Sequence, residues 1–312
     1  MTKNSKRLHR SSSCVDVPCL EVASHQRSGG GVERLVRNRH GAVLRIHTLG
    51  APAISIPGLV SIVDVCGRMG DADWTGRTLP ANVAVLSVTT RGEIASDKDD
   101  RAAPVLALTG AATRAGRYAV SRDVAVTLAL LDPRWICTVG ATPSSACTDR
   151  RLSMTDLAPA RHCRRLLSAM REAGNAHGRS WVLLHWLEDA WRQAAGRSTP
   201  RAGPGSAGPG SLRNASPRSQ RQRERVFLRE HGVSMSRYRS IERFQHAVAG
   251  LAGGQSGAAL ALEAGYADQS HMCHQVRSLS GLAPTQLKRA LSAGLFTATY
   301  AAMPGFEKQL VL

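Results

Sequence analysis

The chain has 312 residues, enough for two domains of ordinary size joined by a linker. Its 41 Lys and Arg against 23 Asp and Glu give a formal net charge of +18, which favours a polyanionic partner. No apolar run approaches the roughly 18 residues of a membrane-spanning helix, and no signal peptide is evident at the N-terminus. Seven cysteines, an odd number without framework spacing, favour reduced thiols. These features predict a cytoplasmic location and no membrane partner.

The first 195 residues are expected to form a tail and one β-rich domain. Residues 1–31 are polar, Ser-rich and basic, which predicts a disordered basic tail. In the region 32–195, β-branched runs separated by Gly, Pro and Asp turns predict strands over 42–49, 59–66, 83–90 and 124–131. Helical spacing beyond Pro133 predicts helices over 156–171 and 181–193. We therefore expect a β-sandwich or cupin-like sensor and dimerisation domain with trailing helices.

Charge and composition vary along the chain. The stretch 64–100 is acidic and has the character of an ordinary globular surface. Residues 196–217 are rich in Gly, Pro and Ser and predict a linker. By contrast, residues 197–245 contain eleven Arg and three Glu, so positive charge is concentrated there. The remaining segments are an all-α domain over 218–292 and a tail over 293–312.

The stretch from Leu260 to Leu287 has the layout of a helix-turn-helix. A short apolar helix meets Gly265, which can supply the positive φ that ends a helix. Asp268 is a good N-cap for a second helix. That second helix carries one apolar stripe at helical spacing, formed by Met272, Val276 and Leu279. Its remaining face is largely polar, as a groove-binding helix requires.

A second copy of this pattern lies 49 residues upstream. The shift places Ser219 at the position of Asp268 and Gly232 at the position of Gly281. Because one offset keeps caps, apolar positions and a glycine together, the sequence predicts two tandem helix-turn-helix units. A helix over 237–251 is expected to join them.

The motifs of both units resemble those of a known family. The run Gly265-Tyr266-Ala267-Asp268-Gln269-Ser270-His271, followed by Gly281-Leu282-Ala283-Pro284, resembles the second helix-turn-helix signature of the AraC/XylS family of bacterial transcription regulators. Arg243-Phe244-Gln245 with Ala247 resembles the linker helix of that family, and residues 219–222 and 227–234 resemble its first recognition helix and turn. Leu108-Thr109-Gly110, the run to Leu131 and residues 149–157 resemble a variant N-terminal sensor domain that often accompanies it. The resemblance implies a regulator that lays two recognition helices into successive major grooves of double-stranded DNA.

Two groups of side chains are candidates for contacting DNA. On the first recognition helix, with Arg223 and Phe227 as its seam, the polar side chains that face away are Arg221, Glu224 and Arg225. Arginine can bind guanine O6 and N7 bidentately, and glutamine can read adenine. The base-reading candidates of the second helix are Gln269, Ser270 and His274. Phosphate contacts position a protein on DNA without reading the base sequence. The candidates for such contacts are Arg218, Arg237, Arg239, Arg277 and Lys288.

The first unit departs from the pattern of the second. Its positioning helix is expected near 207–215, where Pro209 and two glycines are poor helix formers. Arg223 occupies the position of Met272, in the middle of the expected apolar seam. A buried unpaired guanidinium would be costly there, so it must reach solvent, pair with an acid or accompany loose packing. We therefore expect a thinly packed C-terminal domain.

Three alternatives to a sequence-specific regulator stay open. A regulator with a degenerate first unit could act through a protein partner, and a basic chain could bind nucleic acid without specificity. A cupin-like enzyme is the third, although His40 and His47 stand seven apart without a close partner and no G-x-S-x-G or H-E-x-x-H motif occurs. We expect no enzyme activity, cofactor or metal. RNA polymerase and a second copy of the chain are candidate partners, and the sequence names no small-molecule effector.

Overall fold

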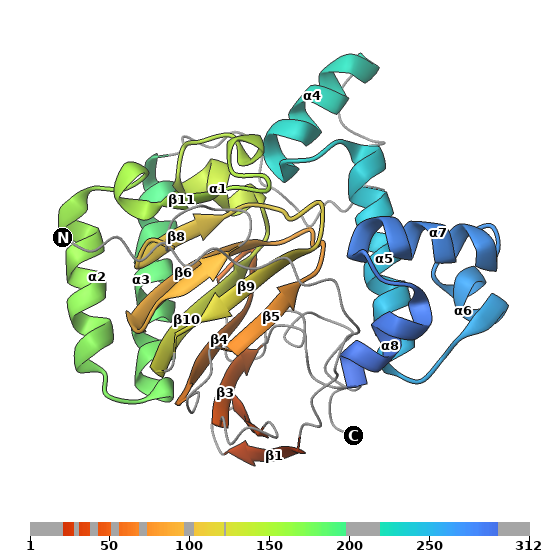
Figure 1. The fold of residues 1–312 in the computed structure, drawn as a ribbon. Helices are drawn as coiled ribbons and strands as arrows, with labels where there is room; N and C mark the ends of the chain where they lie inside the picture. The colour runs from red at the N-terminus through yellow and green to blue at the C-terminus, as the bar shows by residue number, and fades with distance from the viewer. Residues whose placement is uncertain are drawn as a thin grey trace, which may run out of the picture.

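The computed structural model describes residues 21–27, 31–37, 43–50, 56–68, 74–96, 103–121, 123–197 and 219–292. Antiparallel strands form the body of the N-terminal region, helices α2 and α3 lie on one side of it, and helices α5 to α8 lie on the other (Figure 1). The predicted class, a β-rich domain with trailing helices followed by helix-turn-helix units, is confirmed. The predicted linker, 196–217, lies almost entirely outside the described residues.

Eleven strands form two sheets in the described part of the chain. They are β1 (Glu21–Arg27), β2 (Gly31–Arg37), β3 (Val43–Gly50), β4 (Leu59–Arg68), β5 (Trp74–Thr78), β6 (Ala84–Arg91), β7 (Ile94–Ser96), β8 (Leu106–Thr109), β9 (Gly116–Val120), β10 (Asp123–Leu131) and β11 (Arg151–Ser153). The larger sheet has the order β1-β2-β3-β4-β10-β6-β8-β11, and the smaller has the order β5-β9-β7. The four predicted strands correspond to β3, β4, β6 and β10.

The helices follow the two regions of the chain. The N-terminal region contains α1 (Arg134–Val139), the 3-10 turns η1 (Ser144–Ala146) and η2 (Met154–Asp156), α2 (Ala160–Glu172) and α3 (Ala176–Arg197). The C-terminal region contains α4 (Gln220–His231), α5 (Met235–Ala252), α6 (Gly257–Glu263), α7 (Gln269–Ser280) and α8 (Pro284–Ser292). The two predicted trailing helices correspond to α2 and α3. Within this described part, no helix is both long and apolar enough to span a bilayer.

Strand β10 occupies the middle of the larger sheet because it is apolar on both faces. Its sequence DVAVTLALL is an almost continuous apolar run, which is typical of a strand covered on both sides. One face packs with the helices, in a cluster that includes Ile62, Leu131, Leu166 and Leu187. The other face carries a second cluster of Val120, Val124 and Val126 beside the smaller sheet. The sheet is therefore the central layer of the N-terminal region.

A buried ion pair ties α3 to this sheet. Asp64 on β4 is fully buried and accepts two hydrogen bonds from the Arg179 guanidinium, at 2.8 and 2.6 Å. Thr127 on β10 donates a third, at 2.6 Å. These bonds satisfy a carboxylate whose burial would otherwise be strongly unfavourable. The interpretation of the acidic stretch 64–100 as ordinary surface is therefore wrong at Asp64.

The tail predicted for residues 1–31 does not hold for residues 21–27. Residues Glu21–Arg27 form β1, which pairs antiparallel with β2 along its whole length. The disordered tail predicted for 1–31 therefore does not extend through this strand, and residues 1–20 lie outside the described residues. The physical reason is that a β-ladder uses main-chain donors and acceptors, so a polar segment can pair with an edge strand.

The C-terminal helices share a compact apolar core. Helix α5 is its axis, with Ile241, Phe244 and Val248 completely buried, and Met272 and Val276 of α7 are equally buried. The predicted thin packing is therefore wrong for the half of this region that contains α5 to α8. Helix α4 has a smaller share of buried side chains, which are Phe227 and His231. Val63, Leu79, Ala81 and Leu130 of the β-rich region belong to the same cluster, so the core continues from sheet to helices.

Candidate nucleic-acid interface

Helices α4 and α7 are built by the same terminal signals. Ser219 begins α4 with a capping box, in which its hydroxyl accepts from the Gln222 amide and its own amide donates to the Gln222 side chain. Asp268 begins α7, and its carboxylate accepts from the His271 amide at 2.7 Å. Each N-cap side chain satisfies an amide that the first turn of a helix leaves unpaired.

The two helices also end alike. Gly232 and Gly281 are left-handed C-caps with φ of +79° and +73°, a conformation that glycine adopts without steric cost. The 49-residue offset therefore predicts both ends of both helices. The predicted connecting helix, 237–251, is α5.

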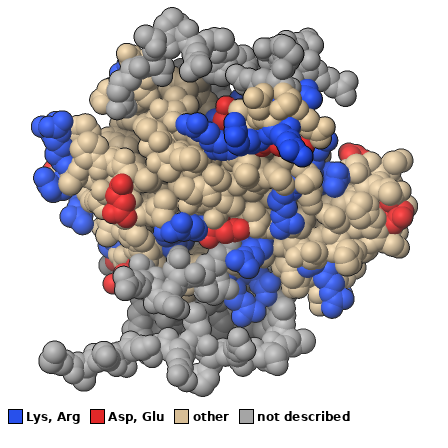
Figure 2. Space-filling view, turned by 90° about the horizontal axis from the view of Figure 1, so that it is seen from above, with Lys and Arg blue, Asp and Glu red and all other residues tan. Residues whose placement is uncertain are grey.

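The six base-reading candidates all lie on exposed helix surface. Arg221, Glu224 and Arg225 are exposed on α4, and Gln269, Ser270 and His274 are exposed on α7. The structure thus groups each trio on its own helix. Glu224 accepts a hydrogen bond from Gln220 at 3.0 Å, which fixes its carboxylate against the same face. Figure 2, which looks down on the end of the molecule where α4 lies, shows a band of Lys and Arg with acidic side chains beside it.

Arg223 is exposed rather than buried in an apolar seam. Of the three ways to accommodate it at this position, the structure shows the side chain reaching solvent. The residues expected to form the positioning helix, 207–215, lie outside the described residues.

The phosphate candidates separate into two groups. Arg239 and Arg277 are exposed, whereas Arg237 and Lys288 are half-buried and donate to protein carbonyls. Arg237 donates to Thr113 O in the β-rich region, and Lys288 donates to Gly254 O just after α5. Arg218 lies outside the described residues. Phosphate contacts by these five side chains stay predictions, and the exposed pair is better placed for them.

Helices α5 and α7 are locked together by polar and aromatic contacts. Ser240 donates to the Gln275 side chain at 2.8 Å. Arg243 lies over the Tyr266 ring, with its guanidinium carbon 5.8 Å from the ring centre, a cation–π arrangement. Tyr266 is only 2 % exposed, and this burial raises its pKa to about 12, so the phenol stays neutral. These contacts hold the second unit together around α5 and α7.

The sequence of this region matches a family model. Residues 214–290 match the model described as a helix-turn-helix domain, which is of the AraC type. The C-terminal segment is an AraC-type helix-turn-helix domain. This AraC-type domain makes the chain a DNA-binding transcription regulator. No curated protein matches the chain.

Solved structures of one protein are similar to the chain at low identity. The crystal structure of ToxT from Vibrio cholerae O395 is 11 % identical, covers 74 % of this chain and 98 % of its own, and has a TM-score of 0.35. A ToxT structure from the P21 crystal form is also 11 % identical, covers 73 % and 97 %, and has a TM-score of 0.36. At such TM-scores neither superposition assigns a ligand or a residue role to this chain.

Sequence reasoning missed the side chains that join the AraC-type domain to the β-rich region. Cys137, next to α4, donates to Arg229 O at 3.2 Å, and Thr148 donates to Gly232 O at 2.7 Å. Asn82 donates to Tyr238 O at 2.9 Å. No local signal marks these residues, because each is ordinary in its own segment and acquires its partner only in the folded chain.

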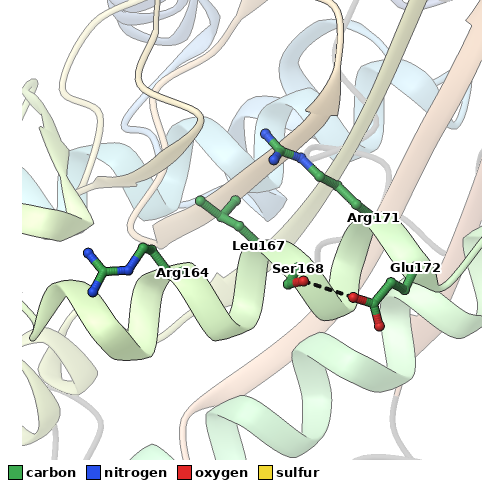
Figure 3. Close-up of a pocket in the computed structure, with 5 residues that line it drawn as sticks. All are labelled: Arg164, Leu167, Ser168, Arg171 and Glu172. Atoms are coloured by element: carbon green, nitrogen blue, oxygen red, sulfur yellow. Dashed lines mark hydrogen bonds between the residues drawn. The ribbon is translucent and has the colours of Figure 1, made fainter.

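Two further features lie outside the AraC-type domain. A shallow depression on α2 is lined by Arg164, Leu167, Ser168, Arg171 and Glu172, and Ser168 donates to Glu172 at 2.8 Å (Figure 3). All five side chains come from one helix, so the depression is the surface between successive turns. Among the described residues no group of three His, Cys, Asp or Glu could hold a metal ion. His47, considered above for a cupin-like metal site, is buried with its Nδ1 3.4 Å from the Ser180 hydroxyl.

Proposed function

We propose that the chain is a sequence-specific regulator that inserts α4 and α7 into successive major grooves. The observation that carries the proposal is the matched construction of the two helices, with the same caps, the same left-handed glycine and exposed polar faces. A helix fits the major groove, and two recognition helices about one helical turn of DNA apart read one face of the duplex. The net charge of +18 supplies the sequence-independent part of the affinity.

The two helices have complementary roles in this proposal. Helix α4 offers arginines at its exposed positions, so it contributes more of the charge and the stronger guanine contacts. Helix α7 offers Gln269, Ser270 and His274 on a unit with a complete apolar core. Arg239 and Arg277 contact phosphates and set the register of both helices. The regulator acts in the bacterial cytoplasm, and RNA polymerase and a second copy of the chain are its candidate protein partners.

Arg225→Ala in the full chain tests the proposal. DNA from upstream of its own gene and of neighbouring genes serves as the probe, titrated across a salt series. Wild type should form a site-selective complex that weakens steeply with salt. Arg225→Ala should lose about 1–3 kcal/mol and relax the preference at one base pair. Arg277→Ala should instead weaken binding to every sequence and reduce the salt slope by about one.

Each contrary outcome points to a different function. Equal affinity for all sequences, with parallel losses in both variants, would exclude specific readout and leave a non-specific nucleic-acid binder. A wild-type chain that is folded but binds no DNA would favour a regulator that acts through a protein partner.

One observation favours that partner-dependent regulator as a second candidate. Leu228 on α4 is 42 % exposed at the position equivalent to Arg277 on α7. An apolar side chain at this position suits a protein surface better than a phosphate. Leu228→Arg separates the two candidates, since it should strengthen DNA binding if α4 enters a groove and should have no effect on DNA affinity if α4 contacts a protein.

A further inference from the structure

Helix α4 is held by the β-rich region as well as by its own domain. Its C-terminal end packs against η1 and α1, and within the AraC-type domain it packs against α5. Helix α7, by contrast, packs against α5, α6 and α8. Figure 1 shows one end of α4 beside α1 and the other projecting from the molecule. The two recognition helices therefore differ in what supports them.

The contact at the end of α4 is polar and specific. A helix leaves its last carbonyls without partners inside the helix, and here the β-rich region supplies donors to that end. Cys137 Sγ donates to Arg229 O at 3.2 Å, and Thr148 Oγ1 donates to Gly232 O at 2.7 Å. The same region serves α7, because the Ala115 amide donates to Leu279 O at 3.1 Å. Both recognition helices thus end against the β-rich region.

The packing at Gly232 leaves no space for a side chain. A Cβ built there would lie 2.6 Å from Thr148 Oγ1 and 3.0 Å from Ser144 O, so neighbouring atoms would have to move. At the equivalent Gly281 nothing lies within 4 Å of such a Cβ. The close approach is therefore a property of the α4 contact, and not of the left-handed cap that both helices share.

The segment of the β-rich region that makes this contact is itself firmly held. Ser144 is 1 % exposed, and its hydroxyl donates to Pro133 O at 2.6 Å. Cys147 is fully buried, and its carbonyl accepts from the Gly110 amide at 2.9 Å. Asp149 accepts from the Thr113 amide at 2.9 Å. A rigid segment of this kind can orient a helix that rests on it.

We propose that residues 132–149 form the support of the first recognition helix, with Thr148 as its main positioning residue. The β-rich region then takes part in DNA recognition without touching DNA, by fixing the direction in which α4 leaves the molecule. This role rests on the proposed insertion of α4 into a groove. It also gives an event in residues 132–149 a direct route to the half-site that α4 reads.

Thr148→Val in the full chain, compared with Thr142→Val, tests the support. Valine has nearly the shape of threonine and removes the donor to Gly232 O, whereas Thr142 donates to Gly140 O in its own turn. Hydrogen exchange in the absence of DNA is the first measurement. Amides of α4 should exchange about five- to tenfold faster in Thr148→Val, the effect of losing one net hydrogen bond, while amides of α7 stay unchanged.

Binding to DNA is the second measurement, with the upstream fragment that wild type selects and two versions in which either half-site is scrambled. Thr148→Val should weaken binding to the intact fragment about five- to tenfold and should equal wild type when the α4 half is scrambled. Equal hydrogen exchange of α4 in both variants would overturn the support. Faster exchange with unchanged affinity for the intact fragment would overturn the positioning role. Faster exchange in a chain whose wild type selects no DNA would confirm the support and refute the proposed function.

Discussion

The paired glycines Gly232 and Gly281 allow the docking of α4 to be measured separately from helix capping. They lie 49 residues apart, and each adopts a left-handed conformation at the end of a helix, α4 or α7. Alanine at either position incurs the same backbone strain, about 1–2 kcal/mol for an L-residue in the left-handed region. Gly281→Ala should cost this amount alone, because its added methyl group meets nothing within 4 Å.

Gly232→Ala should cost more because the new methyl group overlaps the β-rich region. Its Cβ would lie 2.6 Å from Thr148 Oγ1 and 3.0 Å from a backbone oxygen, Ser144 O. Overpacking of this kind typically costs about 1–3 kcal/mol beyond the strain. The expected total loss of unfolding free energy is therefore about 2–5 kcal/mol. If α4 leaves its support at a lower cost, the loss is limited to the free energy of docking α4.

Urea unfolding and hydrogen exchange of the full-length variants distinguish these responses. The difference between the two variants in unfolding free energy measures the clash, and rapid exchange confined to α4 identifies undocking. Equal destabilisation by Gly232→Ala and Gly281→Ala, with equal protection of α4, would refute the reasoning. It would show that the contact with Thr148 and Ser144 does not hold the helix.

Two further predictions concern buried ionisable groups. Arg179→Met should cost about 3–5 kcal/mol in urea unfolding, because it leaves the fully buried Asp64 without its cation. The double variant Asp64→Leu/Arg179→Met should regain most of this loss, and a double variant no more stable than the single one would contradict the explanation. Burial lowers the pKa of His231, which lies against Phe227 beside the Asp132–Arg134 pair. Stability from its neutral form is therefore complete above the unfolded pKa of about 6.5 and is lost as pH falls toward the folded pKa. His231→Gln should flatten the dependence of unfolding free energy on pH between 8 and 5. His246→Gln, on the exposed face of α5, is the control and should not flatten it. Identical slopes in wild type and both variants would exclude His231 as the cause.

Local signals in the sequence predicted the elements that carry the proposed function. Ser219 and Asp268 can accept from free amides, and Gly232 and Gly281 can adopt positive φ. The residue type at each position therefore indicates a helix start or a helix end. The continuous apolar run of β10 predicted a strand in the same way. These inferences succeeded because caps and hydrophobic periodicity act within one element or between neighbouring residues.

The inferences that failed depended on partners far along the chain. Asp64 is acidic in a surface-like stretch, yet Arg179, 115 residues later, neutralises it in the core. No pattern within a single segment contains the identity of such a partner.

The sequence by itself therefore determined that the C-terminal region has two similarly capped helices, where each begins and ends, and which polar side chains each carries. Only the tertiary structure decided what holds the first of them. Thr148 meets Gly232 across 84 residues, and Ala115 meets Leu279 across a still longer separation. These contacts arise because the sheet and the helices share one continuous apolar core, whose packing brings the distant donors to the ends of the two helices.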